Sequence, residues 1–93
     1  MKKLYASTVM KNKHTTGTVN YYKIMDEKYG IEIVKKEYGK DEIKCEKNSV
    51  NKISTNESKI INIIEKLKSN KVTPIGLNDV LLDLLKQPQF QGE

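Results

Sequence analysis

The sequence predicts an α+β protein in which an antiparallel β-meander of three or four strands is followed by two helices packed on one face of the sheet. Two observations support this fold class. Short runs rich in β-branched and aromatic residues, separated by glycine-containing turns, fill the first half of the chain. Most of the leucines and isoleucines then fall at helical spacing between residues 54 and 86. Short turns between consecutive strands favour antiparallel neighbours, so the helices are expected to cover one face of the sheet.

The alternation of apolar and polar residues is clearer in some of the expected strands than in others. Residues 2–10 alternate weakly, so they are expected to form an edge strand, and a three-stranded sheet that leaves them loose is the alternative. Residues 48–53 are expected to be a connection into the first helix. The expected strands are residues 2–10, 18–26, 31–38 and 42–47, with turns at 26–30 and 39–41.

The first helix has recognisable start and stop signals. Ser54 and Glu57 have the spacing of a capping box, which satisfies free backbone amides at a helix N-terminus. Asn70 suits a left-handed residue at the helix end. The predicted inner face consists of Ile60, Ile63, Ile64 and Leu67.

The second helix is predicted to begin at Thr73 and Pro74. Threonine suits an N-cap, and proline suits the first helical position because its missing amide has no intrahelical partner there. The predicted inner face consists of Leu77, Val80, Leu81, Leu84 and Leu85. Residues 1–86 are therefore expected to form a single α+β domain, and residues 87–93 a flexible tail.

The composition favours a soluble protein of a reducing compartment. The 93 residues contain one cysteine, which excludes an internal disulfide, and no apolar run approaches the length of about 20 residues that a membrane span needs. We expect a cytoplasmic protein without membrane contact. The net charge of +5 arises from 17 basic residues, all of them lysine. Because arginine is the usual residue for bidentate recognition of phosphate and guanine, its absence weakens the case for nucleic-acid binding.

Three sequence motifs carry a resemblance to a known family. They are YGIEI at Tyr29–Ile33, IST at Ile53–Thr55 and KVTPIGLNDVLLDLL at Lys71–Leu85. In this order they resemble family 6514, an uncharacterised domain of unknown function found in short clostridial and other Firmicutes proteins. The resemblance covers roughly residues 17–85. It implies a Gram-positive bacterial origin and a strand-then-helix order, but it assigns no activity, cofactor or site residue.

The residues that could carry chemistry do not form a recognisable catalytic or metal-binding pattern. His14 is the only histidine and lies in a polar segment without nearby metal ligands in the sequence, which is typical of a surface loop. Cys45 could act as a nucleophile only if an oriented histidine met it in space. Its alternation with charged neighbours favours a buried structural thiol instead. We therefore expect no enzyme activity, no cofactor and no metal.

The most specific functional prediction is a partner-binding strip on the second helix. On a helical wheel, Ile75 and Leu82 lie beyond the predicted inner face, next to Asp79 and Asp83. Coverage by the first helix or by Phe90 is one interpretation. The other is an exposed apolar strip that forms a homodimer seam or docks another protein. This interpretation gives the predicted function, a non-enzymatic regulatory or adaptor module acting by protein–protein contact through the helix pair.

The alternative function is weak nucleic-acid binding through the N-terminal strands. Residues 1–25 carry five lysines and no acidic residue, and tyrosines lie among them. Lysines and stacking aromatics on a sheet can bind single-stranded nucleic acid. The candidate residues are Lys11, Lys13, Tyr22 and Lys23. A basic face that is merely solvated would give the same sequence pattern.

Overall fold

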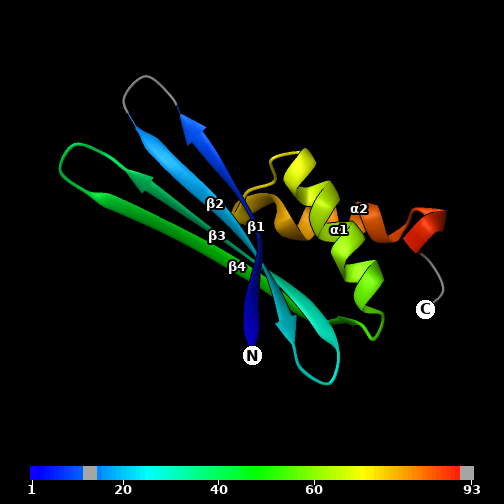
Figure 1. Ribbon diagram of the computed structural model, residues 1–93. Coiled ribbons are helices and arrows are strands. Elements are labelled where there is room, and N and C mark those ends of the chain that lie inside the picture. The colour runs from blue at the N-terminus through cyan, green and yellow to red at the C-terminus, as the bar shows by residue number, and fades with distance from the viewer. Residues whose placement is uncertain (12–14, 91–93) are drawn as a thin grey trace.

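The chain folds into a four-stranded antiparallel sheet with two α-helices on one of its faces (Figure 1). The computed structural model describes residues 1–11 and 15–90. The strands follow each other in the order β1-β2-β3-β4, so the predicted meander is confirmed in its four-stranded form. The strands are β1 (Lys2–Lys11), β2 (Thr16–Met25), β3 (Tyr29–Tyr38) and β4 (Ile43–Ser54). The helices are α1 (Glu57–Ser69) and α2 (Leu77–Leu85), with short 3₁₀ helices η1 (Pro74–Gly76) and η2 (Pro88–Phe90).

Strand β4 is longer than the sequence predicts. Residues 48–53, expected to be a connection, continue the strand to Ser54, and Asn48 and Val50 pair with Ile33 and Ile31 of β3. Although most residues of this segment are polar, they alternate between the two faces of the sheet, and Asn48 and Val50 lie on the face with the helices. Pairing to β3 holds the segment in the sheet despite its low apolar content.

The core lies between the helices and one face of the sheet. Its members share near-complete burial, and they come from both inner strands, both helices, the segment that joins the helices, and η2. They are Val19, Tyr21, Ile31, Ile33, Ile60, Ile63, Ile64, Leu67, Val72, Leu77, Leu81, Leu84 and Phe90. The predicted inner face of α1 is therefore fully buried, whereas Val80 and Leu85 of α2 are only half-buried.

Helix α1 begins two residues later than the capping box predicts. Asn56 is the N-cap, and its side-chain Oδ1 accepts a hydrogen bond from the Lys59 amide at 3.2 Å. Ser54 is buried at the end of β4, where its Oγ accepts from the Asn56 amide at 3.0 Å. Pairing of Ser54 with Tyr29 keeps this serine in the strand, and Asn56, two residues further on, caps the helix instead.

The end of α1 is a Schellman motif centred on Lys71. The Val72 amide donates to the Leu67 carbonyl at 2.9 Å, and the Lys71 amide donates to the Lys68 carbonyl at 3.0 Å. Lys71 has a φ of 52°, so the left-handed residue follows Asn70, which has a φ of −91°. Burial of Val72 in the core accompanies this geometry, as the hydrophobic contact of a Schellman motif does.

Two other helix-terminus expectations differ from the structure. Thr73 precedes η1, but its side chain makes no capping hydrogen bond, and α2 itself starts after Gly76. At the other end, the chain does not leave the domain at residue 87. Phe90 is 4% exposed and belongs to the core cluster. The fold thus continues through η2, and residues 91–93 lie outside the described part of the chain.

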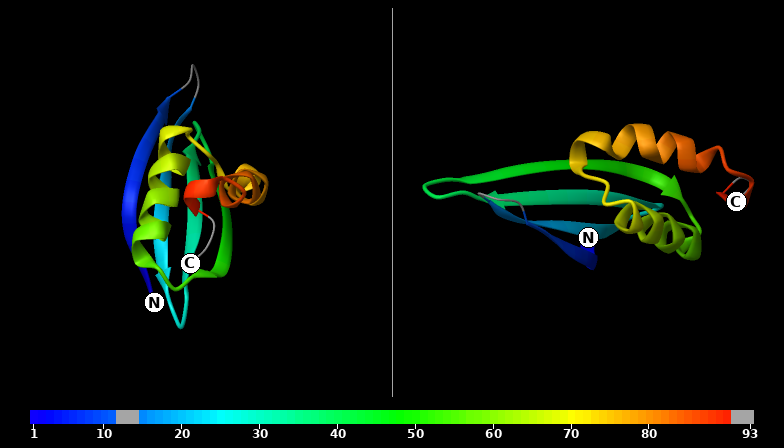
Figure 2. Two further views of the ribbon diagram at one scale, coloured as in Figure 1. Left: turned by 90° about the vertical axis from the view of Figure 1, so that its right-hand side faces the viewer. Right: turned by 90° about the horizontal axis from the view of Figure 1, so that it is seen from above.

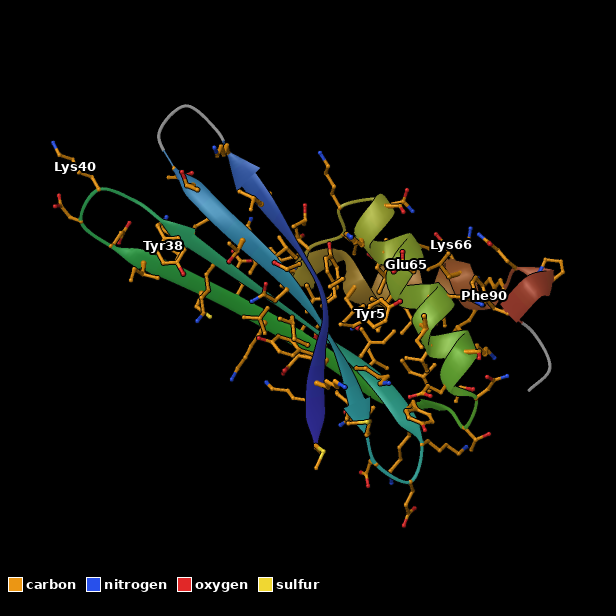
Figure 3. All side chains as sticks on the ribbon, viewed as in Figure 1. Tyr5, Tyr38, Lys40, Glu65, Lys66 and Phe90 are labelled. Atoms are coloured by element: carbon orange, nitrogen blue, oxygen red, sulfur yellow. The ribbon has the colours of Figure 1, made fainter. Side chains whose placement is uncertain are left out.

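The sheet is longer than the layer of helices that covers it. Both helices gather at one end of the sheet, and the end with the β3–β4 turn projects beyond them (Figure 2). Tyr38 and Lys40 mark this projecting end, whereas Phe90 and Lys66 lie at the helical end (Figure 3). The elongated dimensions of 46 × 26 × 17 Å reflect this offset. Because both helices lie on the same face of the sheet, the other face is free of helices along its whole length (Figure 2).

Candidate functional site: a groove between strand β4 and helix α2

A hollow lies between edge strand β4 and helix α2. We call it the α2–β4 groove, and its volume is about 540 Å³. Its lining residues are Ser49, Val50, Asn51, Lys52, Ile53, Asn78, Leu81, Leu82 and Leu85. Lys52 is the single titratable residue among them, so the groove offers mainly apolar and amide surface.

One wall of the groove is the side of α2 that faces β4. Leu81 is anchored in the core with 4% exposure, and Leu85 is half-buried. Leu82 remains 59% exposed, because it lies about 100° further around the helix than Leu81. This wall therefore runs from the core outward into solvent along a row of three leucines.

The other wall is the end of β4, which is distorted by a bulge opposite Gly30. The pairing of β3 with β4 shifts register between Tyr29 and Ile31. A Cβ at Gly30 would lie 2.5 Å from the Val50 carbonyl oxygen, so only glycine permits this close approach of the two backbones. Lys52 has a φ of 54°, and this left-handed residue redirects the strand before Ile53. The distortion leaves Val50 and Ile53 half-buried beside α2.

Asn48 closes the groove at the end near η1. Its Nδ2 donates to the Pro74 carbonyl oxygen at 3.1 Å and lies 3.5 Å from Oδ1 of Asn78. Its own Oδ1 accepts from the Ser49 amide at 2.9 Å. One side chain thus links the edge strand to η1 and α2 and satisfies a backbone donor of that strand. An added β-strand would have to displace this contact, so the groove is suited to side chains more than to strand pairing.

The residues predicted for partner binding are all exposed, but they do not form one strip. Leu82 lines the α2–β4 groove, whereas Ile75, 80% exposed, lines a separate hollow of about 410 Å³ with Glu46, Lys47, Asn48 and Pro74. Asn78 lies between Ile75 of η1 and Leu82 of α2 along the chain, and it lines the α2–β4 groove. Asp79 and Asp83 are also exposed, about 60° and 100° beyond Leu82 on the side of α2 away from β4.

Sequence reasoning about α2 alone missed the β4 half of the groove. Val50 and Ile53 come from a segment that looked like a connection, and their apolar character was the one signal available. The bulge opposite Gly30 sets which residues of β4 turn toward α2.

The residues of the nucleic-acid alternative are divided between the two faces of the sheet. Tyr22 lies on the helix-free face, where the Lys2 ammonium lies 4.9 Å from the ring centroid. Lys11 lies on the same face, in register with Thr16. Lys23 lies on the helix-covered face and forms an ion pair with Glu57 of α1. Lys13 is outside the described residues.

The structure corrects the prediction for Cys45. Its thiol is exposed, because Cys45 pairs with Lys36 on the helix-free face and not on the helix-covered one. His14 lies outside the described residues. In the part of the chain that the structure describes, no group of three or more His, Cys, Asp or Glu residues could hold a metal ion. No helix within the same part is long and apolar enough to cross a membrane.

These features define a small α+β protein with an apolar groove beside an edge strand. A family model described as "Family of unknown function (DUF6514)" matches residues 1–87. The chain therefore belongs to this family, which confirms the resemblance carried by its three motifs. No match was found among curated proteins or among solved structures.

Proposed function

We propose that this chain is a non-enzymatic regulatory or adaptor protein that binds another protein through the α2–β4 groove. The observation that carries the proposal is the 59% exposure of Leu82 in a groove that is also lined by the apolar residues Val50, Ile53, Leu81 and Leu85. We also propose a cytoplasmic setting in a Gram-positive bacterium, which the exposed thiol of Cys45 would suit.

The free energy of burial supports a protein partner for this groove. Val50, Ile53 and Leu85 are half-buried, so a partner's side chain that filled the groove would remove the remaining apolar surface from water. Burial of apolar surface is worth about 25 cal/mol per Å², and a fully buried leucine about 1.5–3 kcal/mol. Interfaces place such apolar residues at their centre and polar residues at the rim, where Asn51, Lys52 and Asn78 lie here.

A photo-crosslinking residue at position 82, introduced in the native host, would test the proposal. Crosslinks to one protein species are expected from position 82, because its side chain lines the groove. The same residue at Asp83 is the matched control, since Asp83 is exposed on the same helix but faces away from β4. Equal crosslinking from both positions, or none from position 82, would contradict a partner in the groove.

The substitution Leu82→Lys tests whether partner binding can be weakened while the protein stays folded. Leu82→Lys is expected to weaken crosslinking at a second groove position, Lys52, while leaving the circular dichroism and the thermal midpoint close to those of the wild type. Light scattering on the wild type and Leu82→Lys would show whether the partner is a second copy of this chain. If Leu82→Lys unfolds the protein, Leu82 belongs to the core and the groove is not a free surface.

A further inference from the structure

The two faces of the sheet differ in charge, which the composition of the chain does not reveal. We call the face without helices the open face. Its charged residues on the four strands are Lys2, Lys11, Lys36, Lys47 and Glu32. The helices lie on the other face, as shown by the hydrogen bond from the Tyr21 hydroxyl to the Val72 carbonyl and the ion pair of Lys23 with Glu57.

Apart from Glu32, the carboxylates of β3 and β4 lie away from the open face. Glu37 and Glu46 lie on the helix-covered face, in register with Lys44 and Lys35. On the open face, Glu32 is occupied by an ion pair with Lys2. Among the described residues, no carboxylate forms an ion pair with Lys11, Lys36 or Lys47. Three positive charges without an ion-pair partner among the described residues therefore remain on the open face.

Two tyrosines lie at opposite ends of these three lysines. Tyr38 is opposite Thr16 and Ile43 at the projecting end of the sheet (Figure 3), and the residue is 44% exposed. Tyr22 pairs with Glu32 of β3, and Glu32 lies six positions before Tyr38 on that strand. The two tyrosines are therefore about 20 Å apart along the strands. The rows of side chains between them contain Lys36 and Lys47.

We propose that the open face binds single-stranded nucleic acid, with phosphates on Lys11, Lys36 and Lys47 and bases stacked on Tyr38 and, once a base displaces the Lys2 ammonium from its ring, on Tyr22. Charge complementarity favours single-stranded nucleic acid over a second copy of this chain or a membrane. A second copy would bring the same uncompensated lysines against each other. An anionic membrane binds more firmly where apolar side chains insert beside the lysines, and Thr18, Asn20 and Ser7 interrupt the apolar residues of this face.

The residue types on the open face predict binding that tolerates different sequences. Stacking on tyrosine is available to every base, and lysine acts on phosphate as a point charge. The chain contains no arginine for bidentate contact to guanine. This site is separate from the α2–β4 groove, so the two interfaces can be tested independently.

Fluorescence anisotropy with labelled oligo(dT) and oligo(U) of about 12 nucleotides would test the proposal. Three lysine–phosphate contacts on a single strand predict a slope of log affinity against log salt of about −2. The affinity should therefore fall about 20-fold between about 50 and about 200 mM KCl. The double variant Lys36→Gln/Lys47→Gln should bind at least about tenfold more weakly, and its affinity should fall only about threefold over the same salt range. Tyr38→Ala should weaken binding at least about fivefold.

The matched control is Lys35→Gln/Lys44→Gln, which removes the same charge from the opposite face of the same two strands. This control should keep close to wild-type affinity, and circular dichroism should show all variants folded. Equal weakening by both double variants would mean that net charge alone attracts the oligonucleotide, which would overturn the proposal. Absence of binding at about 50 mM KCl would also overturn it. Binding to phosphatidylserine vesicles that Lys36→Gln/Lys47→Gln abolishes, without oligonucleotide binding, would assign the open face to a membrane surface instead.

Discussion

The Tyr21 hydroxyl donates a hydrogen bond of 2.9 Å to the Val72 carbonyl oxygen, and this bond joins the centre of the sheet to the segment between the two helices. Both residues are buried, so no water replaces the bond if it is removed. Tyr21→Phe keeps the ring but leaves the Val72 carbonyl without this donor. We expect it to lower the free energy of unfolding by about 1–3 kcal/mol in urea melts. Tyr38→Phe, at an exposed tyrosine, should stay within about 0.5 kcal/mol.

The same tyrosine predicts a loss of stability at high pH. Burial raises the pKa of Tyr21 above its usual value near 10. Above pH 10 the unfolded chain therefore releases the phenolic proton while the folded chain retains it. The stabilisation is fully present below pH 10 and is lost as the pH rises toward the folded-state pKa.

Comparison of wild type with Tyr21→Phe isolates this effect, since the two proteins differ only in the phenolic hydroxyl. Urea melts between about pH 9 and about pH 11 should show a steeper decline for the wild type. Parallel declines would mean that Tyr21 ionises equally well in both states.

The N-cap of α1 predicts a difference between two residues that both look like caps. Asn56→Ala removes the acceptor of the Lys59 amide and should cost about 1 kcal/mol. Thr73→Ala should be close to neutral, because the Thr73 side chain makes no capping hydrogen bond. Thermal melts of the two variants check this, and a larger loss for Thr73→Ala would contradict the structure.

The left-handed residue at the end of α1 predicts that one glycine substitution stabilises the protein and another destabilises it. Lys71 adopts a φ of 52°, which costs a residue with a Cβ about 1 kcal/mol and costs glycine little. Lys71→Gly should therefore raise the free energy of unfolding by up to about 1 kcal/mol. Lys68→Gly, inside the last turn of α1, should lower it by a similar amount. Two changes of the same sign in urea melts would rule out the Schellman geometry.

The fold was largely predictable because the periodicity of apolar residues is strong in the elements that build the core. The stripe of Ile60, Ile63 and Leu67 on α1 needs only helical spacing to be recognised, and its burial follows. Strand β4 was predicted too short because its second half is polar. Its place in the sheet comes from pairing with β3, which is a property of two distant segments.

The candidate sites were less predictable, because each depends on register. The exposure of Leu82 could be anticipated from a helical wheel, whereas the contribution of Val50 and Ile53 depends on the bulge opposite Gly30. Cys45 was placed on the wrong face for the same reason. Alternation shows that Cys45 and Ile43 share a face, but only the pairing with β3 shows that this face is the open one.

The projection of the sheet beyond the helices implies a gradient of hydrogen-exchange protection within single strands. Amides of β3 near Ile31 and Ile33 lie under the core and can exchange only by large-scale unfolding. Amides of the same strand near Lys36 and Tyr38 have no covering layer, so opening of the β3–β4 turn exposes them without disturbing the helices. One strand thus belongs to two units of different local stability. The amides near Lys36 and Tyr38 are therefore expected to exchange before those near Ile31 and Ile33, while the core stays folded.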